Sequence, residues 1–278
     1  MRWTDMHPLR NRGVTLVELI VVIAITGIVG AAVAVFIRRP VEGYVDAARR
    51  AALTDEADTA LRRMTRDLRL ALPNSVRVDG TGKFVEYIAT TGGGRYRAES
   101  GTGGSGNNIL DFTATDNDGF DVLGPVPTLV TGVNGNQIVV YNLYSDGATS
   151  NAYSGDNRAA LTGVGTIPIE PKLFPESSPS KRFHVVSGPV TYGCTGGQLV
   201  RYWGYAYNAA QVAPPVGGTS AVLAANVDQG ECQFVYTTGA LSERIATVSI
   251  VLQINSIAAS GGLERVRMFQ QAQVSNAP

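Results

Sequence analysis

A long uncharged segment near the amino terminus limits what this chain can fold into. Residues 14–37 are almost entirely apolar, and the 19 residues from 19 to 37 carry no charge. As a helix, residues 14–37 would be about 36 Å long at roughly 1.5 Å per residue, enough to cross the hydrocarbon layer of a bilayer. Basic residues flank the segment on both sides, at Arg2, Arg10, Arg12, Arg38 and Arg39. The start of the chain is therefore predicted to be a targeting or membrane segment.

One acidic residue, Glu18, lies near the start of this apolar segment. A carboxylate in hydrocarbon costs several kcal/mol, on the order of 3 kcal/mol, unless it finds a partner, so an acid at such a position is expected to have a function. The alternative interpretation is that Glu18 lies at headgroup depth, close to the basic residues, and stays solvated.

The residues around Glu18 resemble a known sequence motif. Arg12-Gly13-Val14-Thr15-Leu16-Val17-Glu18-Leu19, followed by an unbroken apolar stretch, is similar to the leader and N-terminal helix of type IV prepilins and type II secretion pseudopilins. The resemblance implies that a prepilin peptidase cuts between Gly13 and Val14 on the cytoplasmic side and methylates the new amino terminus, so that residues 1–13 are lost. Many members of the family have phenylalanine after the cut. This chain has Val14 there, which could change the efficiency of methylation.

The same resemblance implies a role for Glu18 in subunit assembly. In the family this glutamate pairs with the amino terminus of a neighbouring subunit. The physics supports that role, because opposite charges stabilise one another strongly where water is scarce. We expect Glu18 to set the register between subunits.

An ordinary secretory signal is the alternative for this segment. Ala32-Val33-Ala34 is a small-x-small sequence after an apolar core and a basic start, which predicts cleavage before Val35. The acidic Glu18 inside the supposed apolar core argues against this alternative, and so does the helical pattern that follows almost without a break.

Residues 38–72 are predicted to continue the helix in amphipathic form. Pro40 is expected to break or kink the helix and Pro73 to stop it. Between them apolar residues recur at spacings of three and four, at Val41, Tyr44, Val45, Ala48, Ala52, Ala57, Leu61, Met64, Leu68 and Leu72. Acid–base pairs four residues apart are expected at Asp46–Arg50 and Asp58–Arg62. The apolar stripe should pack against a sheet, while the charged face is solvated or contacts neighbouring subunits.

Residues 73–278 read as a β-rich head. Strand patterns separated by Gly, Asn and Asp turns are expected at residues 83–89, 137–143, 182–186, 198–207 and 231–237, with a terminal hairpin over residues 245–254 and 263–274. No linker is long enough to require a second domain. The predicted fold class is α+β and pilin-like, with a long N-terminal helix, half membrane-embedded and half amphipathic, packed on a mostly antiparallel β-sheet head.

Three segments of the head are expected to be turns or exposed loops. Residues 92–108 and 145–157 are rich in Gly, Ser, Asp and Asn and poor in core-forming residues. Residues 80–83 (Gly-Thr-Gly-Lys) lack the full phosphate-loop spacing and are expected to form a hairpin turn.

Both cysteines, Cys194 and Cys232, fall in the part of the chain expected outside the cytoplasm, where thiols are oxidised. We expect a disulfide that closes a loop of about 38 residues. The alternative is two separate buried thiols.

Few features of the sequence indicate enzyme activity or the binding of nucleic acid, cofactors or metal ions. The 23 basic and 23 acidic residues cancel, which excludes nucleic-acid binding through bulk positive charge. A chain without its leader would hold a single histidine, His184, in a strand pattern and without a Gly-x-Ser-x-Gly nucleophile motif. We therefore expect no enzyme activity, no cofactor and no transition metal. Residues 114–125 fail the EF-hand spacing, although Asp116, Asp118 and Asp121 leave a looser calcium site open.

These features predict a structural assembly subunit held in the inner membrane with its head in the periplasm. The last six residues, 273–278, are similar to the last strand of large minor pilins, notably the MSHA-biogenesis (MshO-like) group and the J-class pseudopilins. The resemblance implies prepilin peptidase, other minor pilins, the major pilin and an inner-membrane assembly platform as partners. The alternative is a membrane-anchored adhesin or ligand-binding module, which would use the Gly-rich loops or the aromatic residues Tyr202, Trp203, Tyr205 and Tyr207.

Overall fold

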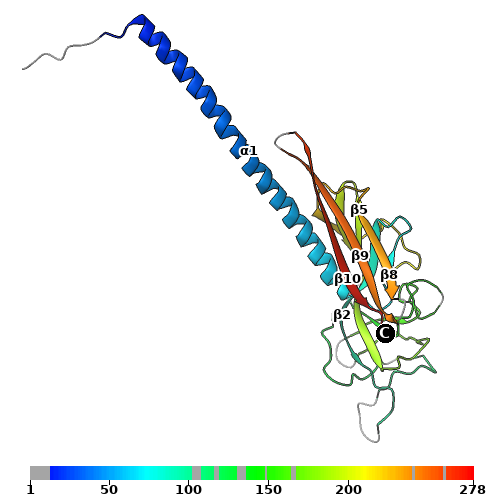
Figure 1. The fold of residues 1–278 in the computed structure, drawn as a ribbon. Helices are drawn as coiled ribbons and strands as arrows, with labels where there is room; N and C mark the ends of the chain where they lie inside the picture. The colour runs from blue at the N-terminus through cyan, green and yellow to red at the C-terminus, as the bar shows by residue number, and fades with distance from the viewer. Residues whose placement is uncertain are drawn as a thin grey trace, which may run out of the picture. The chain divides into compact units, whose positions relative to one another are not determined.

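The structure is a computed structural model, and it describes residues 13–101, 108–115, 119–129, 136–147, 149–163, 167–239, 242–258 and 261–278. A single helix, α1 (Leu16–Arg69), precedes all the strands of this described part (Figure 1). The strands are β1 (Arg77–Val78), β2 (Phe84–Arg95), β3 (Gln137–Val140), β4 (Arg158–Ala160), β5 (Arg182–Thr195), β6 (Gln198–Trp203), β7 (Thr219–Ala224), β8 (Gln233–Gly239), β9 (Ser242–Ile257) and β10 (Leu263–Ser275). One long helix followed by antiparallel sheets confirms the predicted α+β class.

The chain divides into two compact units. The first comprises Met1–Ala51 with Ile257–Gly262, and the second comprises Ala52–Ser256 with Leu263–Pro278. In the first unit the apolar side chains of α1 are exposed, with Leu16 at 74% and Phe36 at 81% of their full accessible surface. By length and composition this helix could cross a membrane. An apolar helix of this kind needs lipid or other helices around it, because water covers it poorly.

The helix does not end at Pro40, so of the two expected effects, a break or a kink, the break does not occur. Pro40 lies inside α1, which continues to Arg69. A proline removes one backbone hydrogen bond and crowds the preceding turn, and a helix of 54 residues absorbs that local loss.

The second unit buries one face of α1. The buried part of this face begins later than the sequence predicts, and the helix itself ends earlier. Burial starts at Leu53, while Val41, Tyr44 and Val45 are exposed, and it follows spacings of three and four through Ala57, Ala60, Leu61, Met64 and Leu68. The helix ends at Arg69, not at residue 72. Leu72 has already left the helix, because its backbone N–H donates to the carbonyl of Ile88 in β2 at 2.8 Å.

The larger sheet has seven strands arranged around β5. Along one edge β5 pairs with β2, which continues to β1, and all these pairings are antiparallel. Along the other edge the first half of β5 pairs with β3 and the second half with β6. Pro189 lies where the β3 pairing has ended and the β6 pairing has not begun. Its missing N–H is therefore tolerated in a central strand.

The smaller sheet has three strands in the order β10–β9–β8. The predicted terminal hairpin is confirmed, since β9 and β10 are neighbours and residues 258–262 connect them. The backbone N–H of Ala258 donates to the carbonyl of Gly262 at 2.8 Å and that of Gly261 to the carbonyl of Ala258 at 2.9 Å. The expected turn at residues 80–83 is also found, between β1 and β2. There the Asp79 carboxylate accepts the backbone N–H groups of Thr81 and Phe84.

The prediction that residues 92–108 form an exposed loop is wrong for its first part. Residues 92–95 belong to β2 and pair with β5. A Cβ atom at Gly93 would lie 2.8 Å from the Phe183 carbonyl oxygen, and one at Gly94 would lie 2.9 Å from the Phe183 ring. The glycines thus allow close packing of two strands, which composition alone does not distinguish from a flexible loop.

Residues 145–157 form a loop, as expected, and Asp146, Gly147 and Thr149 are exposed. The expectation of exposure is wrong for the second part of the loop, where Ala152, Tyr153 and Asn157 are buried. Polar side chains of this segment form hydrogen bonds with the segment's own backbone. Asp156 accepts the N–H groups of Ser150 and Asn151, at 2.5 and 2.9 Å. The Tyr153 hydroxyl donates to the carbonyl of Ser75, outside the segment, at 2.8 Å.

Other strand boundaries also differ from the expected ones. β6 ends at Trp203 rather than at residue 207, because Gly204 adopts a φ of 71° that turns the chain out of the strand. The short strands β1, β4 and β7 are not predicted by the sequence patterns.

The largest hydrophobic cluster joins α1 to both sheets. It contains the buried face of the helix, Tyr87 of β2, Tyr192 of β5, Phe234 of β8, Ile250 of β9 and Val274 of β10. A second cluster, around Phe120, Phe174 and Phe183, fills the part of the head beyond β3 and β4. The helix is therefore a core element of the head.

The two cysteines for which we expect a disulfide are joined in the structure, with Cα atoms 6.4 Å apart. Cys194 lies in β5 and Cys232 just before β8, so the bond links the larger sheet to the smaller one. Both residues are buried.

We predict that the native protein resists thiol labelling until it is reduced, and that reduction lowers its melting temperature. The 38-residue separation corresponds to about 4 kcal/mol in the chain-entropy model. Maleimide labelling with and without reductant, followed by thermal unfolding, tests this. Labelling of the unreduced native protein at either cysteine would contradict it.

Candidate assembly site

The first turn of α1 is organised by Thr15. The Thr15 hydroxyl oxygen accepts the backbone N–H of Glu18 at 3.2 Å, and its carbonyl accepts the N–H of Leu19 at 3.1 Å. Thr15 is therefore the N-cap of the helix. The pattern Thr15-x-x-Glu18 is that of a capping box, a signal that the sequence analysis did not use. It places the acid in the first helical turn, where the helix dipole favours negative charge.

Glu18 is exposed at the start of an apolar surface. Its neighbours on the helix are exposed as well, with Val14 at 71% and Val17 at 68% of their full accessible surface. Within the described residues no basic group lies at ion-pair distance from the Glu18 carboxylate. In hydrocarbon such a carboxylate needs a cation from elsewhere.

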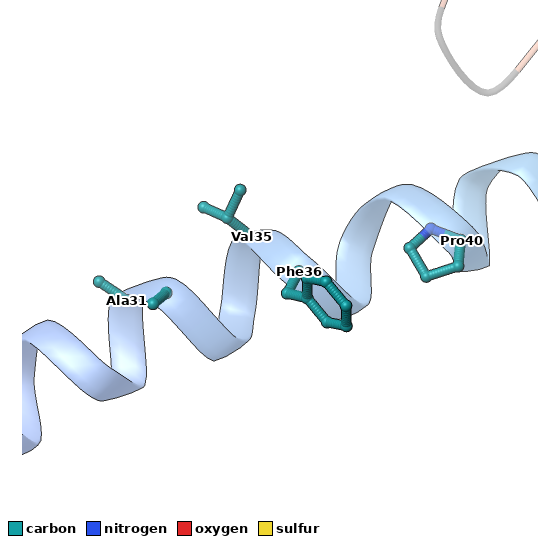
Figure 2. Close-up of a pocket in the computed structure, with 5 residues that line it drawn as sticks. Ala31, Val35, Phe36 and Pro40 are labelled. Atoms are coloured by element: carbon teal, nitrogen blue, oxygen red, sulfur yellow. The ribbon is translucent and has the colours of Figure 1, made fainter.

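Further along the first unit, the helix presents a strip of small and large apolar residues. Ala31, Ala32, Val35, Phe36 and Pro40 line a shallow hollow. Figure 2 shows Ala31, Val35, Phe36 and Pro40 along successive turns of α1. The strip is an open surface of one helix rather than an enclosed cavity. Small residues in this position permit close approach of another helix in a membrane.

In the second unit, polar contacts tie α1 to the larger sheet. The Tyr192 hydroxyl of β5 donates to the Asp67 carboxylate at 2.5 Å, and Arg201 of β6 lies 3.6 Å from the same carboxylate. One turn after Leu53, the Glu56 carboxylate accepts the backbone N–H of Ala225 at 2.7 Å. Burial is the main cause that raises the pKa of Tyr192, with further contributions from its bond to Asp67 and the negative charge there. These contacts fix the axial position of the helix on the sheet.

A buried ion pair joins β1 to β2. Arg77 Nε lies 2.7 Å from Glu86 Oε2, and both side chains are nearly inaccessible. The Tyr205 hydroxyl donates to Glu86 Oε1 at 3.0 Å, and the guanidinium of Arg77 lies 3.6 Å from the centre of the Tyr153 ring. Burial raises the pKa of Glu86, and the charge of Arg77 opposes this shift. No sequence pattern predicted this pair, since its members come together only through the β1–β2 register.

The aromatic residues considered for ligand binding are mostly engaged within the head. Tyr205 is buried, with its hydroxyl 2.6 Å from that of Thr191. The guanidinium of Arg158 covers the ring of Tyr207 at 3.7 Å, and Arg201 lies near the ring of Trp203 at 4.8 Å. Tyr202 is half-buried. These contacts argue for packing roles and weaken the adhesin alternative at this position.

His184 lies in β5, opposite Gly93 of β2 and Val139 of β3. Burial lowers the pKa of His184 to about 4, and the positive charge of Arg182 acts in the same direction. Its imidazole is therefore neutral at pH 7 and a weak base. This environment suits a strand residue better than a general base, whose pKa should lie near the working pH.

Of the three residues of the loose calcium site expected from the sequence, Asp116 and Asp118 lie outside the described residues. Asp121 is described, and its carboxylate lies 3.2 Å from the guanidinium of Arg97. Among the described residues no group of three or more His, Cys, Asp or Glu side chains is arranged to hold a metal ion.

Comparison with known proteins adds one finding. A family model described as the prokaryotic N-terminal methylation motif matches residues 8–34, which include Gly13, Val14 and Glu18. The match supports the type IV prepilin-like family and indicates a pilin-like precursor that is processed by prepilin peptidase. It does not extend into the head. No curated protein and no solved structure matches the chain.

The motif and the exposed apolar helix together indicate a membrane anchor that carries a periplasmic head. Such a motif implies assembly with other pilins in general, and the proteins that carry it have structural roles. The candidate assembly site thus begins at Gly13, just before α1, and continues along the apolar N-terminal part of the helix.

We predict that His184 makes the head less stable in acid. Its folded-state pKa of about 4 lies below the unfolded value of roughly 6.5, so the unfolded chain takes up the proton first. The stability contributed is present above pH 6.5 and is lost as the pH falls towards 4, by at most about 3 kcal/mol. Urea unfolding at pH 7, 6, 5 and 4 should show a smaller loss in His184→Gln than in the wild type. Parallel curves for the two proteins would contradict the prediction.

Proposed function

We propose that the chain is a minor pilin or pseudopilin, a structural subunit that initiates or caps assembly of an MSHA-like type IV pilus or of a type II secretion pseudopilus. The observation that carries this proposal is the position of Glu18. It is an exposed carboxylate in the first turn of an apolar helix, inside the segment that matches the methylation motif. The assembly that we infer consists of binding, with no reaction catalysed by the head.

Processing is the first step of the proposed mechanism. Prepilin peptidase cuts between Gly13 and Val14, removes residues 1–13 and methylates the new amino group. The cut leaves Val14 one residue before the helix N-cap, Thr15. The new positive charge therefore stands at the very start of the membrane helix, within the same layer of the bilayer as Glu18.

Assembly is the second step. Residues 14–37 hold the subunit in the inner membrane until it is lifted into the filament, where apolar helices replace lipid as neighbours. Glu18 of one subunit then pairs with the amino terminus of an adjacent subunit. A mismatch of one helical turn would leave both charges unpaired in hydrocarbon, so the pair selects a single register.

The head supports a minor role in this scheme. About 200 residues follow the helix, which is large for a subunit whose copies must tile a whole filament, and the resemblance of the last residues to large minor pilins agrees with this size. The contacts of Asp67 and Glu56 with the larger sheet hold the head on the second half of α1. The partners that we infer are other minor pilins, the major pilin and an inner-membrane assembly platform.

We predict that protein recovered from cells with an active prepilin peptidase begins at a methylated Val14. Gly13→Leu should block this cut because the peptidase must accommodate the residue on the leader side of the scissile bond, and the uncut chain should remain in the membrane. N-terminal sequencing and mass spectrometry measure both outcomes. A chain that begins at Val35 would show cleavage by signal peptidase and exclude the proposal.

We further predict that Glu18→Ala is cut normally but enters assemblies at least tenfold less than the wild type, because one buried charge is left without its partner. Glu42→Ala is the matched control, since Glu42 is a partly exposed acid on the same helix whose ion pair is with Arg38. The readout is recovery of the subunit in sheared filaments or in a detergent-extracted tip complex. Equal recovery of Glu18→Ala and Glu42→Ala would refute the role given to Glu18.

A further inference from the structure

A pocket in the second unit lies where ends of the two sheets come together. It has a volume of about 450 Å³, a size typical of small-molecule sites, and is partly open to solvent. Its walls come from the turn after α1, the residues after β3, the starts of β5 and β9, and the residues after β10, at the end marked C in Figure 1. The lining includes Tyr141, Tyr144, Ser180, Arg182, Arg244 and Asn276.

The pocket is basic. Arg182 at the start of β5 and Arg244 near the start of β9 both line it, and none of the lining side chains is an Asp or a Glu. Arg182 is exposed, and within the described part of the chain no carboxylate lies at ion-pair distance from its guanidinium group. Two arginines in a pocket without an acidic side chain suit a ligand that carries a negative charge.

The residues after β3 add aromatic side chains to this pocket. Tyr144 is 53% exposed, and Tyr141 is half-buried. A tyrosine ring offers a flat apolar face and a hydroxyl group. A small inorganic anion would leave these rings unused, and an apolar ligand would leave the arginines unpaired. An acidic sugar matches both features, because it has a carboxylate, a ring face of C–H groups and several hydroxyls.

Hydrogen bonds between distant segments hold the walls of the pocket together. The side-chain amide of Asn74 donates to the carbonyl of Asn142 at 2.9 Å and to the carbonyl of Asn276 at 3.2 Å. The backbone N–H of Asn276 donates to the carbonyl of Arg244 at 2.8 Å. The pocket is therefore formed by the folded head before any ligand binds, which reduces the entropy that binding costs.

Two residues beside the pocket have unusual backbone conformations. Tyr141 has a φ of 49°, and Lys181, which lies between Ser180 and Arg182, has a φ of 56°. Residues other than glycine rarely adopt this left-handed region, and those that do are enriched at ligand sites and active sites. Tyr141 directly follows β3, and Lys181 directly precedes β5. The two strained residues thus lie in the segments that supply Tyr144 and Arg182.

We propose that this pocket binds an acidic sugar residue of a polysaccharide outside the cytoplasm. Arg182 and Arg244 bind the carboxylate, the ring of Tyr144 packs on the apolar face of the sugar, and Ser180 bonds to a sugar hydroxyl. The open side of the pocket leaves room for the neighbouring sugars of the chain. The site is distinct from the aromatic residues of β6 that the sequence suggested for ligand binding. It gives the head a ligand, which goes beyond the proposed assembly role.

Binding of three probes to the full-length, processed chain in detergent micelles tests the proposal. D-glucuronate carries both the sugar ring and the carboxylate, acetate carries only the carboxylate, and methyl glucoside carries only the ring. Glucuronate should bind with a Kd on the order of 1 mM, as expected for a ligand of about 13 non-hydrogen atoms, and about tenfold more tightly than either other probe. Saturation-transfer NMR titrations measure all three. Equal binding of acetate and glucuronate, or no binding of glucuronate well above the expected Kd, would overturn the proposal.

Substitutions in the pocket test the roles of its residues. Arg182→Gln should lower the affinity for glucuronate about tenfold, and Arg182→Lys should recover part of the loss, because lysine restores the charge without the planar guanidinium. Tyr144→Ala should weaken binding several-fold. Arg63→Gln is the matched control, since Arg63 is an exposed arginine of α1 that does not line the pocket. Cysteines that resist labelling show that each variant is folded. Equal affinity of Arg182→Gln and the wild type would contradict the assignment.

Chemical protection locates the bound sugar. Phenylglyoxal modifies exposed arginines, and mass spectrometry of peptides follows the rate at each one. Saturating glucuronate should slow the modification of Arg182 and Arg244 several-fold and leave Arg63 unchanged. If the rates at Arg182 and Arg244 are the same with and without glucuronate, the sugar binds elsewhere and the proposal is wrong.

Filament entry separates this site from the assembly role of Glu18. Arg182→Gln should enter assemblies at the wild-type level, and Glu18→Ala should bind glucuronate with unchanged affinity. If Glu18→Ala enters assemblies normally while glucuronate binding is as expected, only the proposed function fails. Reduced entry of Arg182→Gln together with unchanged glucuronate affinity would show that the pocket is a contact between subunits, and the sugar proposal would fail alone.

Discussion

The apolar surface of α1 must be covered, and the two halves of the helix meet this requirement in different ways. From Leu16 to Ile37 the exposed residues can be covered only by lipid or by other helices. From Leu53 onward the chain covers its own helix, because the apolar face packs on residues of both sheets. A single helix therefore belongs to the membrane or the assembly at one end and to the core of the head at the other.

Polar contacts then determine where the helix lies on the head. Tyr192 and Arg201 hold Asp67, and Glu56 accepts the backbone N–H of Ala225. These bonds join the helix to β5, to β6 and to the residue that follows β7, and the disulfide between Cys194 and Cys232 links the two sheets.

The sequence predicted the elements with strong periodicity and misjudged those that depend on contacts. The helix, the terminal hairpin and the turn at residues 80–83 follow from local patterns and were predicted, as was the cysteine pair that the structure joins. The loop prediction for residues 92–108 failed at Gly93 and Gly94, whose role is to let Phe183 approach. The prediction for residues 145–157 missed the burial of their second part, because Asp156 satisfies the backbone there inside the protein, and composition cannot distinguish that from solvation.

What the sequence determined by itself is the N-terminal motif and the apolar segment. Gly13, Glu18 and the uncharged residues after them are contiguous, so a local pattern is enough to recognise them. What only the tertiary structure decided is which residues of the head meet. The pair of Arg77 with Glu86 depends on strand register, and the contacts of Asp67 with Tyr192 and Arg201 depend on the packing of α1 on the larger sheet. Contacts between residues so far apart in the chain arise from packing, which no local pattern records.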